Sequence, residues 1–186
     1  MDMFEPTMRA LLDAYPNTHV TSGLQPVSLS DFQAQKDKHL SRNALGGAIG
    51  VIRTPENRVV LVERSTMHAG WALPGGTVEQ NEDFTEAFLR EIHEEIGIDL
   101  INVRLCELEI KTFLSPVGDS LKFALAVFAA KTGIYALPEA TADAAAEGLT
   151  ASLFPIDRLP DRMILGDRQK TIAYGGHEAI SGSVQT

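Results

Sequence analysis

The chain has 186 residues, of which 44% are hydrophobic and 22% are charged. This length and composition are those of one globular domain that buries roughly 70% of its surface on folding. The 25 acidic and 16 basic residues give a net charge of −9. Such a surface repels phosphate backbones and anionic lipids, which argues against nucleic acids and membranes as partners. If the ligand is itself anionic, a metal ion is the obvious source of the missing positive charge.

Targeting and redox signals are few. Cys106 is the only cysteine, which excludes an intramolecular disulfide and a cysteine-based zinc site, and we expect it in or near the core. Residues 1–16 carry acidic residues where a signal peptide carries positive charge. The longest apolar run, 123–130, is far shorter than the roughly 20 residues that span a bilayer. These features predict a soluble, cytoplasmic protein.

Residues 1–42 are predicted to form a helical extension ahead of a main domain over residues 43–186. Pro6 favours the first turn of one amphipathic helix, and Ser30 begins a capping-box pattern for a second. The segment between them, 17–26, is rich in turn-forming residues and is expected to be a turn. We expect the extension to be a packed helical arm or a homodimer contact, with a substrate lid as the alternative.

The main domain alternates strand-like and helix-like segments. Strands are predicted at residues 44–53, 58–64, 100–113, 121–130 and 152–154. One clear helix is predicted over residues 83–96, ended by Gly97, and a last helix over 167–173. Several strands mixed with few helices indicate an α/β or α+β fold with a mixed sheet.

The helix at 83–96 has two unlike faces. Its apolar seam consists of residues spaced by four, with Leu89 beside it: Phe84, Phe88, Ile92 and Ile96. The other face carries Arg90 and three carboxylates, Glu91, Glu94 and Glu95, and each like-charge pair there costs roughly 0.2–0.5 kcal/mol. A solvated acidic face is the ordinary explanation. The functional alternative is a site for a hard cation, since Mg²⁺ and Mn²⁺ prefer carboxylate and carbonyl oxygens.

The segment before this helix favours the cation site. Pro74, Gly75 and Gly76 form a tight turn, where backbone can approach a metal and a diphosphate closely. Gly76, Glu82 and the run 90–98 match every fixed position of the Nudix box signature. A chance match in a chain of this length is on the order of 10⁻⁷ at average residue frequencies. The chain therefore resembles the Nudix hydrolase family over these 23 residues.

The resemblance implies a fold and an activity. Nudix proteins are α/β/α sandwiches around a mixed sheet, and they use Mg²⁺ or Mn²⁺ to hydrolyse a nucleoside diphosphate linked to another moiety. The implied partner is a small nucleotide derivative. A nucleotide sugar, ADP-ribose and a (deoxy)nucleoside triphosphate all stay open as substrates. The alternative function is a sensor module that binds a nucleotide derivative without cleaving it. Such modules typically lose box carboxylates, which this chain keeps.

The resemblance also implies roles for single residues. Glu91 and Glu95 would bind the metal, and Glu94 would be a further ligand or would activate water. The Gly75 carbonyl would complete the metal's shell. The other box positions would orient the carboxylates, approach the diphosphate or shape the backbone: Arg90, Glu82, Gly76 and Gly97.

Residues outside the box are assigned more loosely. Many family members use a distal carboxylate as ligand or base, for which Glu147 is the first candidate here and Glu139 the second. Arg64 is preferred to other strand cations as a phosphate contact, because it ends the strand before the box loop. Trp71 either stacks on a nucleobase or packs against the box, and His68 either assists proton transfer or is an ordinary loop histidine.

Overall fold

The computed structural model describes residues 4–42, 46–64 and 70–176. Its sheet has seven strands in the order β1-β5-β6-β2-β3-β7, with β4 paired to β2 beside this path. The strands are β1 (His19–Pro26), β2 (Gly46–Arg53), β3 (Arg58–Arg64), β4 (Gly75–Thr77), β5 (Ile101–Leu114), β6 (Ser120–Lys131) and β7 (Leu149–Pro155). The helices are α1 (Phe4–Ala14), α2 (Leu29–Arg42), α3 (Phe84–Ile96), α4 (Ala142–Glu147) and α5 (Leu165–Tyr174).

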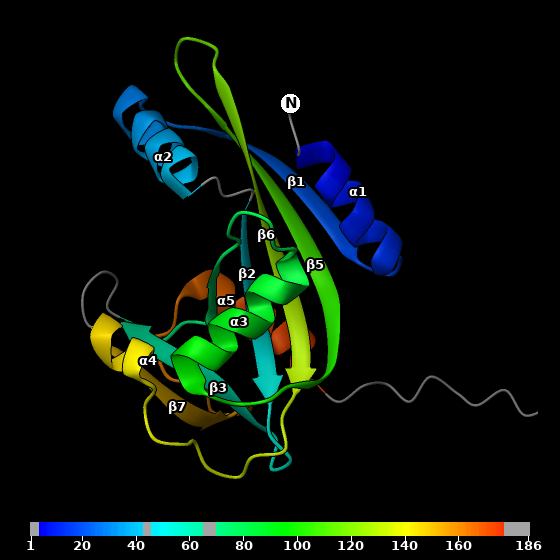
Figure 1. Cartoon of the computed structure of the whole chain (residues 1–186), viewed down its shortest axis with the longest axis vertical. Coiled ribbons are helices and arrows are strands. Elements are labelled where there is room, and N and C mark those ends of the chain that lie inside the picture. The colour runs from blue at the N-terminus through cyan, green and yellow to red at the C-terminus, as the bar shows by residue number, and fades with distance from the viewer. Residues whose placement is uncertain (1–3, 43–45, 65–69, 177–186) are drawn as a thin grey trace, which may run out of the picture.

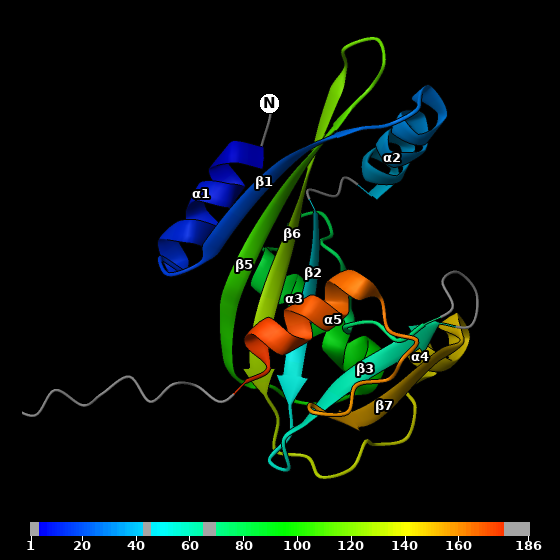
Figure 2. The same cartoon turned by 180° about the vertical axis from the view of Figure 1, so that it is seen from behind.

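The sheet is mixed and is covered on both faces. The β1–β5 and β2–β6 pairs are parallel, and the other pairs are antiparallel. Helix α3 lies on one face and α5 on the opposite face (Figures 1 and 2). The predicted α/β/α sandwich is therefore confirmed. None of the helices in the described ranges is long and apolar enough to cross a membrane.

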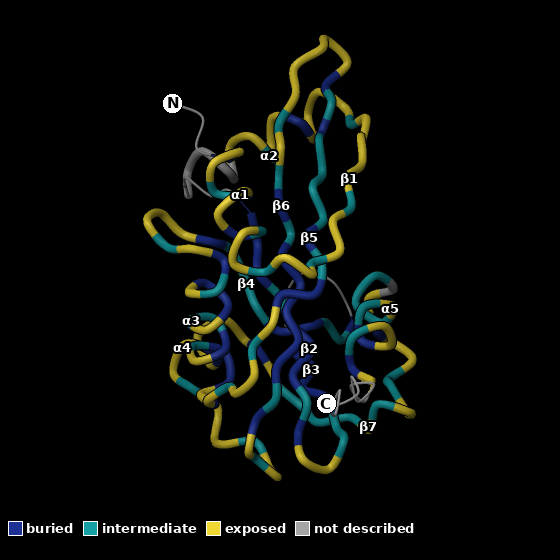
Figure 3. Tube along the Cα trace, turned by 90° about the vertical axis from the view of Figure 1, so that its right-hand side faces the viewer, coloured by how far each residue is buried: buried dark blue, intermediate teal, exposed yellow. Residues whose placement is uncertain are grey.

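Each face of the sheet has its own apolar cluster. The larger cluster lies under α3 and includes the whole predicted seam of that helix, and the Phe88 ring stacks on Phe128 with centroids 4.9 Å apart. The smaller cluster lies under α5 and contains Val51, Leu61 and Met163. Burial concentrates in the central strands, whereas the far end of the β5–β6 hairpin is mostly exposed (Figure 3). Cys106 is buried as expected, but Leu89 is 43% exposed and lies outside the seam.

Local sequence fixes both ends of α3. The Asp83 carboxylate accepts the backbone N–H groups of Thr85 and Glu86, and the Glu86 side chain accepts the Asp83 N–H. This capping box satisfies helix N–H groups that would otherwise lack partners. Gly97 ends the helix in the left-handed conformation at φ 73°, as a C-terminal glycine typically does. The predicted limits of this helix are confirmed.

Of the predictions for the first 42 residues, one is wrong and one is confirmed. The turn expected at residues 17–26 is wrong, because His19–Pro26 pairs with β5 as a parallel strand. Nearly every β1 residue is exposed, so no alternation of apolar and polar side chains marked the strand. The first helix of the extension packs as predicted: Phe4, Met8 and Leu11 join the larger core. The boundary at residue 43 stays a prediction.

Two short elements were not predicted. Strand β4 has three residues, too few for any periodicity, and it exists because Gly75 and Gly76 pair with β2. Helix α4 has six residues, with Thr141 as N-cap and Gly148 in the left-handed conformation at its end. Both elements border the candidate site.

Candidate active site

The turn between β3 and α3 lies against strand β2. Gly75 pairs with Ile49 and Gly76 pairs with Ala48, while the Gly50 N–H donates to the Pro74 carbonyl at 3.0 Å. Gly75 has φ 130°, and a Cβ there would collide with the Ala48 carbonyl oxygen. Only glycine fits this conformation and this close approach without strain. The turn is therefore rigidly held against the sheet.

Two of the predicted metal ligands converge on this turn. Glu95 is 5% exposed, and its Oε2 accepts the Gly75 N–H at 2.9 Å. The Glu91 carboxylate lies against Gly76 so closely that a Cβ on this glycine would clash with it. Gly76 thus leaves the space that the Glu91 carboxylate occupies. Glu91 and Glu95, one helical turn apart on α3, thus both lie against the glycine turn. Their role as metal ligands stays a prediction.

Arg90 connects the remaining box carboxylates. Its Nε and Nη2 donate to the two oxygens of Glu82 at 3.0 and 2.7 Å, and its Nη1 lies 3.1 Å from Glu94 Oε2 and 3.2 Å from Glu91 Oε1. Nη2 also donates to the Thr77 carbonyl at 3.0 Å. The guanidinium therefore spans the loop and the helix, and it compensates part of the like-charge repulsion on α3.

The interactions in this network shift the pKa values of Arg90 and Glu82. Hydrogen bonding to Glu82, opposed in part by burial, raises the pKa of Arg90 above its usual range. Hydrogen bonding to Arg90 lowers the pKa of Glu82, and the Glu79 N–H donates to the same carboxylate at 2.6 Å. Both effects favour the charged forms. Arg90 and Glu82 are thus paired as ions at neutral pH.

The donor chemistry of this cluster fits a hard divalent cation. All candidate ligands are oxygens: the carboxylates of Glu91, Glu94 and Glu95 and the Gly75 carbonyl, the set that Mg²⁺ and Mn²⁺ prefer. Within the described ranges, no three acidic, histidine or cysteine side chains are grouped closely enough to enclose a metal ion. Arg90 and the Gly75 N–H instead hold the carboxylates of Glu94 and Glu95 in this structure.

The two distal acids lie in different settings. Glu139 lines a cavity of about 170 Å³ together with Glu95, between the end of α3, α4 and β7. Glu147 is exposed at the last position of α4 and is not among the described residues that line this cavity. The structure thus brings the second sequence candidate, Glu139, to the same cavity as a predicted metal ligand.

Trp71 packs rather than standing free. Its ring meets Phe154 of β7 edge-on with centroids 4.8 Å apart, and it joins the smaller core cluster, which contains no residue of the box. The predicted packing against the box is therefore wrong, and nucleobase stacking stays a prediction. The side chain of Arg64 and all of His68 lie outside the described residues. Their predicted contacts with phosphate and protons are therefore untested.

Asp167 is a residue near the site that the sequence did not single out. Its Oδ2 accepts the Leu73 N–H at 2.9 Å, across 94 residues of sequence. The Trp71 N–H donates to the Arg162 carbonyl at 2.7 Å, and the Ile164 N–H donates to the Trp71 carbonyl at 2.9 Å. The segment leading into α5 therefore holds residues 71–73, just before Gly75. Burial raises the pKa of Asp167. No sequence signal indicated this contact, since only tertiary packing brings the two segments together.

The site belongs to a recognised class of domain. The NUDIX domain model matches residues 44–173, and the chain belongs to the Nudix family. An 8-oxo-dGTP diphosphatase from Proteus vulgaris is 39% identical over 71 residues, which are 37% of this chain and 63% of that protein. The chain thus matches less than two thirds of the length of this curated relative.

Solved structures share the fold. A MutT protein from Bacillus halodurans gives a TM-score of 0.52 at 22% identity, over 66% of this chain and 76% of that one. The E. coli dihydroneopterin triphosphate pyrophosphohydrolase gives 0.53 at 18% identity, over 69% and 92% of the two chains. At these identities the matches establish the common architecture and no more.

Proposed function

We propose that this chain is a divalent-metal-dependent pyrophosphohydrolase that cleaves the diphosphate linkage of a nucleoside diphosphate derivative. One observation carries the proposal: the carboxylates of Glu91 and Glu95 meet at the Gly75–Gly76 turn. Family membership supports the same reaction class. A solvated acidic helix face would not bury Glu95 at 5% exposure, because burying a carboxylate without a functional or structural partner is costly.

The residues of the turn and of α3 would have different roles in this reaction. Glu91, Glu95, the Gly75 carbonyl and Glu94 would hold Mg²⁺ or Mn²⁺, which supplies positive charge and lowers the pKa of bound water. Gly76 would keep the Glu91 carboxylate in position, because it leaves the space that this carboxylate occupies. Arg90, bound to Glu82, fixes the orientation of the helix carboxylates.

A carboxylate must accept the proton of the attacking water. In the reaction, the water oxygen forms a bond to one phosphorus while the bridging P–O bond breaks, and the leaving phosphate departs with its negative charge. Glu94, 42% exposed along its side chain, is one candidate base. Glu139 is the second, because it shares a cavity with Glu95, and Glu147 is the third.

The substrate class we favour is a (deoxy)nucleoside triphosphate. The support is the Proteus vulgaris relative, which is called an 8-oxo-dGTP diphosphatase. Nucleotide sugars and ADP-ribose are the alternatives within the same reaction class. A sensor module is the alternative outside it, and retention of Glu82, Arg90 and the three helix carboxylates weighs against it.

The test is a panel of nucleotide derivatives incubated with the protein and Mg²⁺ or Mn²⁺ in ¹⁸O-labelled water. Mass spectrometry identifies the products and shows which phosphorus receives the label. We expect a nucleoside monophosphate and pyrophosphate from triphosphates, faster than any product from nucleotide sugars or ADP-ribose. Binding of the panel without turnover would instead favour the sensor, and an inactive Glu95→Gln variant serves as the matched control.

A further inference from the structure

Strand β1 is an edge of the sheet that lacks the usual protection. It ends the strand order, and nearly every one of its residues is exposed, whereas β7 at the other end is half-buried along most of its length. Residues 19–25 contain no Lys, Arg, Asp or Glu, and the pairing of β1 with β5 runs without a bulge. Charges and bulges are common devices that keep an edge strand from pairing with another chain. The β1 edge has neither.

The backbone of β1 alternates between groups that face β5 and groups that face outward. The Val27 N–H donates to the Leu114 carbonyl of β5 at 3.1 Å, so the odd-numbered residues of this parallel pair direct their backbone groups to β5. The even-numbered residues Val20, Ser22 and Leu24 therefore direct their N–H and C=O groups away from the sheet. No hydrogen bond within the described part of the chain uses these outward groups.

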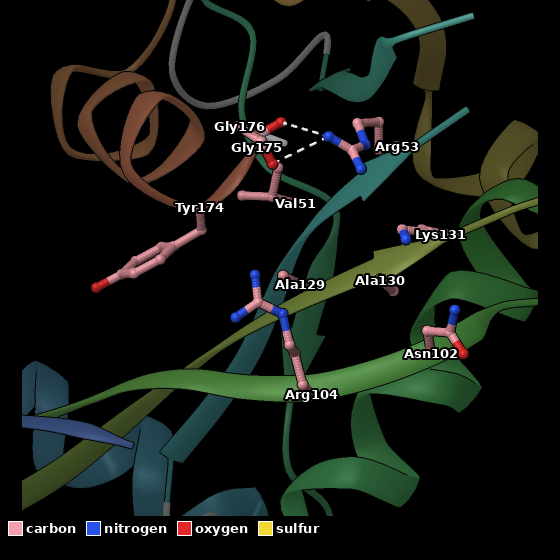
Figure 4. Close-up of a pocket in the computed structure, with 10 residues that line it drawn as sticks. All are labelled: Val51, Arg53, Asn102, Arg104, Ala129, Ala130, Lys131, Tyr174, Gly175 and Gly176. Atoms are coloured by element: carbon pink, nitrogen blue, oxygen red, sulfur yellow. Dashed lines mark hydrogen bonds between the residues drawn. The ribbon is translucent and has the colours of Figure 1, made fainter. Parts of the chain in front are cut away.

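Backbone groups at the ends of other elements have partners within the chain. At the end of α5, Arg53 Nη1 donates to the carbonyls of Gly175 at 3.3 Å and Gly176 at 2.9 Å (Figure 4). At the start of α4, the Thr141 hydroxyl accepts the Ala144 N–H at 3.0 Å. The outward groups of β1 have no such partner among the described residues, and a strand from another chain would pair with them.

A second copy of β1 fits this edge when the two strands run antiparallel about a two-fold axis at Ser22. Ser22 then faces Ser22 of the other copy, and Val20 faces Leu24 of the other copy, so every outward N–H meets an outward C=O. The side chains match as well, because Val20 is 44% exposed and Leu24 is 75% exposed, and apolar cross-strand pairs stabilise a sheet. No charged side chains oppose each other, although two chains of net charge −9 repel elsewhere.

Neighbouring registers satisfy fewer of these backbone groups. An antiparallel register must place outward residues opposite outward residues, which leaves Thr21 and Gly23 as the nearest alternative positions for the axis. An axis at Thr21 would need the N–H of Thr18, which already donates to Tyr15. An axis at Gly23 would need an N–H from Pro26, which has none. Axes farther along the strand pair fewer residues.

We infer that the protein forms a homodimer in which the β1 strands of two copies pair antiparallel about an axis at Ser22. The pairing joins the two sheets into one continuous sheet. The occupant of the edge is a second copy because the apolar side chains of β1 complement themselves in the one register that the backbone groups favour. The inference does not depend on the proposed hydrolysis, because residues 19–26 take no part in the candidate site.

The first test is the dissociation constant of the dimer, measured by sedimentation equilibrium of the full chain. Val20→Lys combined with Leu24→Lys places like charges opposite each other and should weaken the dimer at least about tenfold. Val20→Lys combined with Leu24→Glu places opposite charges there and should restore most of the affinity. Both variants change the same two exposed positions, so an effect on the fold would alter them alike. A wild-type protein that is monomeric at every concentration, or equal weakening in both variants, overturns the inference.

The second test is a disulfide across the axis. In a hydrogen-bonded antiparallel pair the Cα atoms lie about 5.5 Å apart, a separation that a disulfide spans. Ser22→Cys should therefore give a covalent dimer upon mild oxidation, seen by non-reducing electrophoresis. Ala145→Cys, an exposed position on α4, is the matched control and should stay monomeric, and the native Cys106 is buried in both variants. Equal crosslinking of the two variants, or none at Ser22→Cys, contradicts an axis at Ser22.

Discussion

The two faces of the sheet are organised in different ways. On the α3 face, the candidate site is built from residues 75–95, so short-range sequence places its carboxylates and their Arg90 partner together. On the α5 face, contacts join distant segments: Asp167 reaches Leu73 across 94 residues, and Arg53 reaches Gly176 across 123. The first arrangement can be read from a motif, whereas the second exists only after the chain has folded.

Removal of divalent metal should give the largest effect and tests the α3 face as a whole. We expect chelation to abolish turnover, because the metal supplies positive charge that this chain of net charge −9 does not. Far-UV circular dichroism should stay native, since α3 is fixed by its own caps and its buried seam. Unfolding upon chelation would instead indicate a structural ion.

Glu95→Gln should lower kcat by a factor of about 10³ or more, because a charged ligand beside the turn is lost. The amide oxygen can still accept the Gly75 N–H, so the thermal midpoint should change little. Steady-state kinetics with Mg²⁺ as the only metal measure the effect. His93→Gln, an exposed change on the same helix, is the control. Turnover equal to that of the wild type would contradict the assignment.

Gly76→Ala should lower kcat by about 10²-fold, because the added methyl displaces the Glu91 carboxylate and small misplacements at a reacting centre are costly. Mn²⁺ affinity, measured by electron paramagnetic resonance, should fall with it. Gly133→Ala is the matched control, since no described atom lies within 4 Å of its new methyl. If both variants behave alike, Glu91 does not depend on the open space at Gly76.

Asp167→Leu tests whether the hydrogen bond from Leu73 to Asp167 helps to position the Gly75 turn of the candidate site. Loss of the hydrogen bond to Leu73 should loosen residues 71–73, just before Gly75. The metal concentration for half-maximal activity should then rise about tenfold, the effect of one charge-assisted hydrogen bond. Asp167→Asn keeps a carbonyl acceptor and should restore most of the affinity. Equal loss in both variants would show that the charge of Asp167, and not its hydrogen bond, matters.

Substitution of Glu82 should give the smallest effect, which is a change in how the free energy of unfolding depends on pH. Its pKa is lowered in the folded protein by Arg90, so its stabilising contribution is present above the unfolded pKa, near 4.5, and is lost as the pH falls through the folded value. Glu82→Gln should therefore flatten the loss of stability in acid. Urea unfolding at a series of pH values measures this slope, and an unchanged slope would contradict the Arg90–Glu82 pairing.

Prediction from sequence succeeded where all the residues that define an element lie within the element itself. The predicted seam of α3 and its terminal Gly97 lie within one short segment, which also carries Glu91, Glu94 and Glu95. The capping box of this helix was not predicted. The prediction failed at residues 17–26, because β1 has exposed side chains and is defined by pairing with β5. The sequence ranked Glu147 before Glu139, whereas Glu139 is the one that lines the cavity beside Glu95, and it does so only through the fold of residues 137–151.

The sequence by itself determined the family, the acidic helix and the glycine turn, because these depend on spacing within one helix and one loop. The tertiary structure alone decided that Asp167 anchors the segment before Gly75, that Trp71 packs on Phe154, and that Arg53 contacts the end of α5. Such contacts join residues far apart in the chain, and their geometry depends on strand order and register. No local pattern encodes either of these.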